Sequence, residues 1–139
     1  MMSYLNIRRK TVEERNYKHL FNLEHHMKFD KPSEEILTWF EEHTPEGLNI
    51  TKRKMFGYPC RFFNNNMFMG LFQSQVFLRL SKEDKEKFLT IKDAHQFEPM
   101  PGRIMKEYVI LPSALLTNNE QLKYWLSRSL EYMATLPPK

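Results

Sequence analysis

The segment from Ile50 to Leu80 constrains the fold more than any other part of this chain. It consists of short apolar and aromatic runs, which read ITKRKMFG, CRFF, MFMGLF and VFLRL. Runs of this kind, separated by turn residues, are typical of β-strands. The joints between them are Gly57-Tyr58-Pro59, Asn64-Asn65-Asn66 and Gln73-Ser74-Gln75. A parallel pair needs a crossover of a dozen or more residues, so these short joints predict a four-stranded antiparallel meander.

A second hairpin is predicted in the stretch FEPMPGRIMKEYVILP, residues 97–112. Its centre, Met100-Pro101-Gly102-Arg103, matches a type II turn, because proline fixes φ at the second position and glycine supplies a positive φ at the third. The flanking runs HQFEP and RIMKEYVIL are its expected strands. Pro112 has no backbone N–H to donate and marks the end of the second strand.

Three segments have the capping and periodicity of helices. The first has Pro32 in its first turn, Ser33 or Asp30 as N-cap and HTPEG (residues 43–47) as its end; its expected buried face is Ile36, Leu37, Trp39 and Phe40. A short helix follows the N-cap Ser81. The last begins with a capping box at Thr117 and ends before two prolines; its apolar face is Leu122, Trp125, Leu126, Leu130 and Met133. The fold class is therefore α+β, an antiparallel sheet packed with helices.

Residues 1–31 differ from the domain expected over residues 32–139. They hold seven Lys/Arg against four Asp/Glu, which is most of the net charge of +4. A capping box at Thr11 to Glu14 and a partial apolar stripe favour a leader helix. Met27 is an alternative start, which would make the basic leader an optional extension.

Several classes of function lack support in the composition. Cys60 is the single cysteine, which excludes an internal disulfide and a multi-thiolate zinc site. Among the histidines and carboxylates there is no HExxH spacing, and the four glycines form no phosphate loop. No apolar run reaches the length that spans a membrane. We expect a cytoplasmic protein without catalytic residues, metal or cofactor.

The basic run Lys52-Arg53-Lys54, with Phe56 and Arg61 close by, is the first candidate interaction surface. Cations mixed with aromatic side chains occur in proteins that bind nucleic acids. Side chains alternate along a strand, however, so Arg53 faces away from Lys52 and Lys54. Lysines on an edge strand also block edge-to-edge pairing. Edge protection is the favoured interpretation, and contact with nucleic acid is the alternative.

Arg103 and Lys106 form the second candidate surface. On an extended strand Arg103, Met105 and Glu107 share a face opposite Lys106. This pattern suits either an anionic group or peptide, or a structural turn in which Glu107 pairs with a neighbouring cation, and we favour the turn. Turn roles are expected for Gly57, Pro101 and Gly102; Gly70 within a strand indicates a bulge or a close backbone approach, with the bulge favoured.

Five segments together resemble the N-terminal domain of the TfoX/Sxy family: KRKMFG, NNNMFMGLF, LRLSKEDKEKF, FEPMPGRIMKEYVILP and LPPK. The resemblance covers residues 34–139 in the family's order and spacing. It implies an α+β sandwich grouped with secretion-chaperone-like folds. The named members regulate competence genes with a transcription activator and carry a second, C-terminal domain. This chain stops at Lys139, so we expect a stand-alone copy of the N-terminal domain.

The favoured function is a non-enzymatic regulatory module that binds another protein through a sheet face or edge, with a homodimer through the sheet as one form of that interaction. The first alternative is binding of nucleic acid through the leader, Lys52, Lys54 and Arg61. A third hypothesis, a small-molecule binder or enzyme, requires a cavity between the sheet and the last helix.

Overall fold

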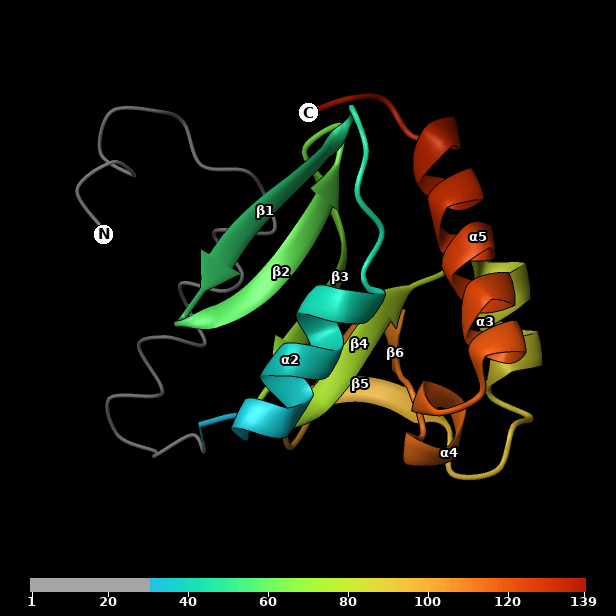
Figure 1. Ribbon diagram of the computed structural model, residues 1–139. Coiled ribbons are helices and arrows are strands. Elements are labelled where there is room, and N and C mark those ends of the chain that lie inside the picture. Colours follow the sequence, from blue (N-terminus) through green and yellow to red (C-terminus); the bar gives the residue numbers. More distant parts are fainter. Residues whose placement is uncertain (1–30) are drawn as a thin grey trace.

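The computed structural model describes residues 31–139, which form one six-stranded antiparallel sheet with helices packed against it (Figure 1). The α+β class and the antiparallel sheet are thus confirmed. The strand order is β1-β2-β3-β4-β6-β5, so the second hairpin joins the sheet through β6. The leader helix predicted after Thr11 and the alternative start at Met27 lie outside the described residues.

The predicted strands correspond closely to the observed ones. The strands are β1 (Ile50–Met55), β2 (Tyr58–Phe63), β3 (Asn66–Phe72), β4 (Gln75–Arg79), β5 (His95–Met100) and β6 (Arg103–Ile110). The helices are α2 (Glu34–His43), α3 (Lys82–Phe88), α4 (Ser113–Leu116) and α5 (Asn119–Thr135). The four-residue helix α4 was not predicted. None of these helices is long and apolar enough to cross a membrane.

Two-residue turns with positive φ connect the first strands. Phe56 and Gly57 have φ values of 57° and 85°, and Asn64 and Asn65 have 50° and 66°. Positive φ at both central residues suits a hairpin, because the resulting twist matches that of the strands. The predicted first joint was wrong in its extent: Pro59 lies within β2, where it pairs with Lys54. The predicted type II turn is supported by the φ of 81° at Gly102.

Gly70 permits a close approach between strands. It pairs regularly with Cys60 on one side and Phe77 on the other. A Cβ atom at this position would lie 2.4 Å from Cζ of Phe77 and 3.0 Å from Cβ of Cys60. The favoured bulge at Gly70 is therefore wrong, because the register shift in this strand pair falls between Arg61 and Phe62.

Side-chain hydrogen bonds cap the N-termini of α2, α3 and α5. Ser33 Oγ accepts from the backbone N–H of Ile36 at 3.2 Å, and Ser81 Oγ accepts from that of Asp84 at 3.2 Å. Pro32 precedes the cap Ser33 and is not in the first turn as predicted. For α5 the predicted cap Thr117 was also wrong: Asn118 Oδ1 accepts from Gln121 N at 3.1 Å.

The sheet buries side chains on both faces. Paired residues across β2, β3, β4 and β6 share one face; these are Arg61, Met69, Leu78 and Val109. α2 and α5 lie on this side, where Met69, Leu78 and Met133 are fully buried in the core. Rings cluster on the other face, with Phe72, Phe77 and Tyr108 each in contact with another ring; Phe77 stacks on Phe97 with centroids 4.8 Å apart.

The segment after α5 returns to the hairpin tip between β2 and β3. Asn64 accepts from the backbone N–H of Lys139 at 3.0 Å, and Asn65 Nδ2 donates to the carbonyl of Lys139 at 2.6 Å. Asn66 Nδ2 donates to the carbonyl of Pro137 at 3.1 Å. The Asn run thus forms the turn and also anchors the segment that follows α5.

Candidate functional site

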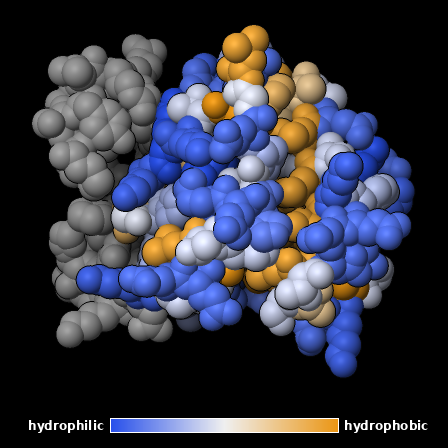
Figure 2. All heavy atoms as spheres, in the orientation of Figure 1, coloured by the Kyte–Doolittle hydropathy of each residue, from blue (hydrophilic) through white to orange (hydrophobic). Residues whose placement is uncertain are grey.

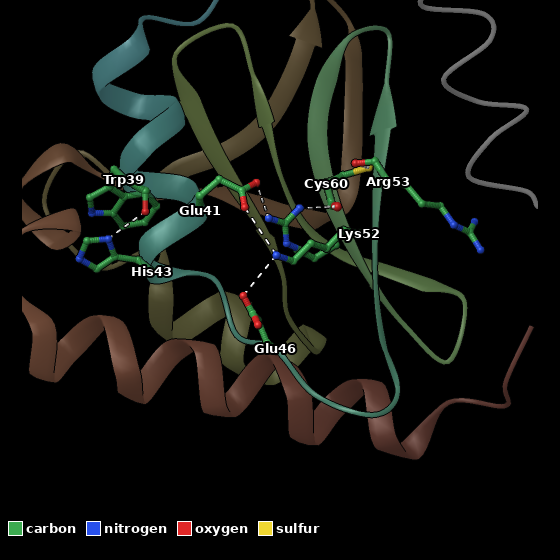
Figure 3. Close-up of polar contacts among 8 residues, drawn as sticks. Trp39, Glu41, His43, Glu46, Lys52, Arg53 and Cys60 are labelled. Carbon is green, nitrogen blue, oxygen red and sulfur yellow. Dashed lines mark hydrogen bonds and ion pairs between the residues drawn. The ribbon is translucent and has the colours of Figure 1, made fainter. Parts of the chain in front are cut away.

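A cluster of charged side chains joins α2 to strands β1 and β2 (Figure 3). Glu41 on α2 lies at its centre, with Oε1 2.8 Å from Nη2 of Arg61 and Oε2 3.6 Å from Nζ of Lys52. The same Lys52 nitrogen lies 3.2 Å from Oε2 of Glu46 in the loop after α2. Two residues of the first predicted surface, Lys52 and Arg61, are therefore engaged by carboxylates of the chain itself.

Arg61 was expected on an interaction surface and is buried instead. Its side chain is 1% exposed. The guanidinium lies 4.8 Å from the ring centroid of Phe40, and Nη1 donates to the carbonyl of Cys60 at 3.0 Å. Glu41 is therefore the counter-ion that compensates an interior charge. An uncompensated interior charge is strongly destabilising, so the cluster fastens α2 to the sheet.

The environment of Glu41 favours its ionised form. The hydrogen bond from Arg61 lowers the pKa of Glu41 below its ordinary value, and the charges of Arg61 and Lys52 add to this effect, while partial burial opposes it. The carboxylate consequently stays charged under mildly acidic conditions and keeps its ion pairs.

The other predicted surface residues do not gather into one patch. Lys54 is exposed on β1, and Phe56 is half-buried in the following turn. Arg103 and Lys106 are exposed on β6, which is separated from β1 by three strands of the sheet. The structural interpretation of the second surface is supported: Glu107 Oε1 accepts from Arg79 Nε at 2.7 Å.

The side chains around Glu107 hold α5 against the sheet. The hydroxyl of Tyr132 on α5 donates to Glu107 Oε2 at 2.7 Å, and Ser129 Oγ donates to the carbonyl of Arg79 at 2.6 Å. Burial and the neighbouring Glu107 raise the pKa of the Tyr132 phenol. The phenol remains a hydrogen-bond donor, and its position is that of a structural contact.

A groove of about 370 Å³ runs between the end of α2 and the outer side of α5. Its apolar lining is Pro45, Leu122, Leu126 and Leu130. Its polar lining is Glu42, His43, Asn119, Lys123 and Ser127. Figure 2 shows an orange, hydrophobic strip between the polar surfaces of the segment around α2 and of α5. Part of the apolar lining of this groove is open to solvent.

The apolar floor of the groove follows from the periodicity of α5. Leu122, Leu126 and Leu130 are spaced four residues apart, so they lie one above the other along one side of the helix. Leu122 is buried against the core, but Leu126 and Leu130 are only half-buried. The apolar stripe of a surface helix normally faces the core of the protein. Here part of the stripe remains open to solvent.

The α2 wall of the groove is held in place by Trp39 and His43. Their rings stack with centroids 4.8 Å apart and planes inclined by 12°. The indole Nε1 of Trp39 donates to the carbonyl of Leu116 at 3.0 Å, which links α2 to the end of α4. His43 Nδ1 lies 2.8 Å from the carbonyl oxygen of Trp39. A carbonyl only accepts, so this ring nitrogen donates, and the imidazole is fixed at the rim of the groove.

Possible metal ligands and the single cysteine were also located within the described residues. Within residues 31–139, no group of three or more His, Cys, Asp or Glu side chains is arranged to hold a metal ion. Cys60 is buried, with its thiol 3.4 Å from the carbonyl of Arg53. The buried thiol is positioned as a structural group.

Glu41, Glu42 and the open part of the leucine stripe were not predicted from the sequence. One signal was available for the two acids. Carboxylates at the C-terminal end of a helix oppose the negative end of its dipole, so each indicates a cationic partner nearby. For Glu41 that partner is Arg61. The opening beside Leu126 has no such signal, because it depends on how far α2 and α5 lie apart.

Comparison with known protein families matches the chain to the family described as TfoX N-terminal domain, over residues 45–133. No curated protein and no solved structure matches the chain. The grouping with secretion-chaperone-like folds stays a prediction. The matched range includes all six strands and most of α5. The chain therefore belongs to the TfoX N-terminal domain family.

Proposed function

We propose that this domain is a regulatory module without catalytic activity that binds another protein in the groove between α2 and α5. The observation that carries the proposal is the half-buried stripe of Leu126 and Leu130. Solvent-exposed apolar surface with a polar rim is typical of sites of protein interaction. Membership of the family supports a competence-regulator-like module.

The groove is better suited to a partner than either edge of the sheet. The edge strand β1 carries Lys52, Arg53 and Lys54, and such charges oppose the addition of another strand. The opposite edge strand, β5, contains Pro99 and has register shifts against β6. Proline and irregular pairing also protect an edge. We therefore place the interaction at the groove.

Binding of nucleic acid has less support than binding of protein. Of the three β-strand residues proposed to contact it, Arg61 is buried and Lys52 is paired with two carboxylates. The carboxylates of Glu41 and Glu46 also bring negative charge next to Lys52. A phosphate backbone needs unpaired cations along its path.

The test is capture of a partner by tagged protein from the source cells, with two variants compared. Ser127→Tyr places a ring in the groove without removing a core contact, because Ser127 is exposed. Ser74→Tyr makes the same change in the exposed β3–β4 turn and serves as the matched control. A clash of about 1.4 kcal/mol reduces binding about tenfold.

We expect one protein to be captured by the wild type and by Ser74→Tyr, and to be lost with Ser127→Tyr. Both variants must keep the thermal midpoint of the wild type. The captured protein is then identified and purified, and its Kd is measured with the same three proteins. Equal capture by all three would contradict the proposal. Gel filtration of the domain alone shows whether the groove binds a second copy instead, since Ser127→Tyr would then convert a dimer to a monomer.

A further inference from the structure

We propose that the occupant of the groove is an amphipathic helix with basic residues on the side that faces α2. The inference rests on the proposed function, because it names the chemistry of the partner that the groove binds. It depends on three features of the described residues: the length of the leucine stripe, the acidity of α2, and the position of Lys123.

The shape of the groove suits a helix. The stripe from Leu122 to Leu130 covers nine residues of α5, and the eight steps between its ends rise about 12 Å at 1.5 Å per residue. Two turns of a partner helix have about this length. Apolar side chains at positions i, i+4 and i+7 of a partner would contact the half-buried Leu126 and Leu130, as in other complexes in which a helix lies in a groove.

The wall formed by α2 contributes one carboxylate to the groove. Of the four glutamates on this helix, Glu34, Glu35, Glu41 and Glu42, only Glu42 lines the groove, next to His43, and the helix has no lysine or arginine. Glu41 is neutralised by Arg61 and Lys52. Glu42 is exposed and lines the groove, at the helix end where the dipole is already negative. A basic side chain of the partner is the complement of this wall.

The opposite wall carries a single positive charge. Lys123 on α5 is exposed and lines the groove beyond the leucine stripe. The two walls therefore differ in sign. A helix with basic residues on one flank and an acidic residue on the other fits them in a single orientation, because the reversed orientation would place like charges together.

Three synthetic 18-residue peptides test the proposal by fluorescence anisotropy with the full chain. The first has leucines at i, i+4 and i+7 spacing, lysines on one flank and one glutamate on the other. The second exchanges every lysine for glutamate and every glutamate for lysine. The third has the composition of the first in scrambled order.

Two charge reversals locate the bound peptide. Glu42→Lys changes the groove wall, and Glu86→Lys makes the same change on α3, where Glu86 is exposed and does not line the groove. We expect the first peptide to bind the wild type about fivefold more tightly than the other two, since one well-placed ion pair contributes up to about a factor of five. Glu42→Lys should remove this preference, and Glu86→Lys should retain it.

Each outcome of these binding experiments either supports or overturns the proposal. The proposal is overturned if the first peptide does not bind, if the charge-exchanged peptide binds equally well, or if Glu86→Lys has the effect expected of Glu42→Lys. If a captured partner is lost with Ser127→Tyr while the peptides show no charge preference, the groove remains the binding site and only the basic helix is wrong. If Ser127→Tyr alters neither capture nor peptide binding, the groove itself is wrong.

Discussion

Arg61 Nη2 lies 2.8 Å from Glu41 Oε1, so a fully buried cation on β2 is compensated by a carboxylate on α2 that is itself 55% exposed. The asymmetry matters for the stability of the domain. Water reaches the acid but not the base, so removal of the acid leaves a charge that solvent cannot reach. The first two predictions follow from this arrangement.

Substitution of Glu41 by Gln should destabilise the domain by about 2 kcal/mol, less than the roughly 3–5 kcal/mol for breaking a fully buried pair, because Glu41 is partly hydrated. Glu46→Gln removes a carboxylate that pairs only with the half-exposed Lys52, and should cost less than about 0.5 kcal/mol. Urea denaturation at neutral pH measures both free energies of unfolding. Similar losses for the two variants would contradict the role of Arg61 as an interior charge.

The stability of the wild type should depend on pH through Glu41. Its pKa is lowered in the folded state from an ordinary value of 4.5. A lowered carboxyl pKa contributes stability that is complete above the unfolded-state pKa and is lost as the pH falls through the folded-state pKa. The difference in free energy of unfolding between wild type and Glu41→Gln should therefore be constant from pH 7 to about 5 and shrink below about 4.5. A constant difference down to pH 2.5 would show that Glu41 does not titrate as the structure indicates.

Substitution of Gly70 by Ala should destabilise the sheet because the added Cβ would lie 2.4 Å from Cζ of Phe77. Overpacking of this kind costs about 1–3 kcal/mol. Phe77→Leu shortens the obstructing side chain, so the double variant should lose less stability than the two single losses added together. The thermal midpoints of the four proteins of this cycle measure the coupling. Additive losses would mean that the strain at Gly70 has another source.

The N-cap of α5 gives a prediction that separates two neighbouring residues. Asn118→Ala removes the side-chain oxygen that accepts from Gln121 N and should cost about 1 kcal/mol. Thr117→Ala removes a hydroxyl that donates to the carbonyl of Ala114 within α4, and should cost clearly less. Urea midpoints of both variants test this order. A larger loss for Thr117→Ala would show that Thr117 caps α5, as expected from the sequence.

Local patterns in the sequence predicted the sheet well. The alternation of side chains and the short joints depend on neighbours along the chain, which a single sequence contains. The errors arose where two local choices compete. Asn118 and Thr117 are both good N-caps, and Pro59 suits a turn as well as a strand position that needs no hydrogen bond. The choice between them is made by packing, which the sequence does not display.

The candidate site was harder to predict because it depends on which element covers which face. Alternation correctly separates Arg53 from Lys52, but it does not reveal that α2 covers Arg61. The leucines of α5 were predicted as part of the apolar face of an amphipathic helix, and periodicity alone does not show that Leu126 and Leu130 are left half-buried. Such incomplete coverage results from the spacing of two helices that lie about eighty residues apart along the chain.

The bonds between the asparagine tip and the segment after α5 bear on the design of ligands for the groove. α5 is attached to the sheet by Ser129 and Tyr132, and the segment just beyond its end is attached to Asn65 and Asn66. A helix held by these contacts should move little when a ligand binds against its side. A small molecule or peptide must consequently match the existing contour of this wall, and selectivity is to be sought by shaping the ligand and not by relying on the domain to adapt.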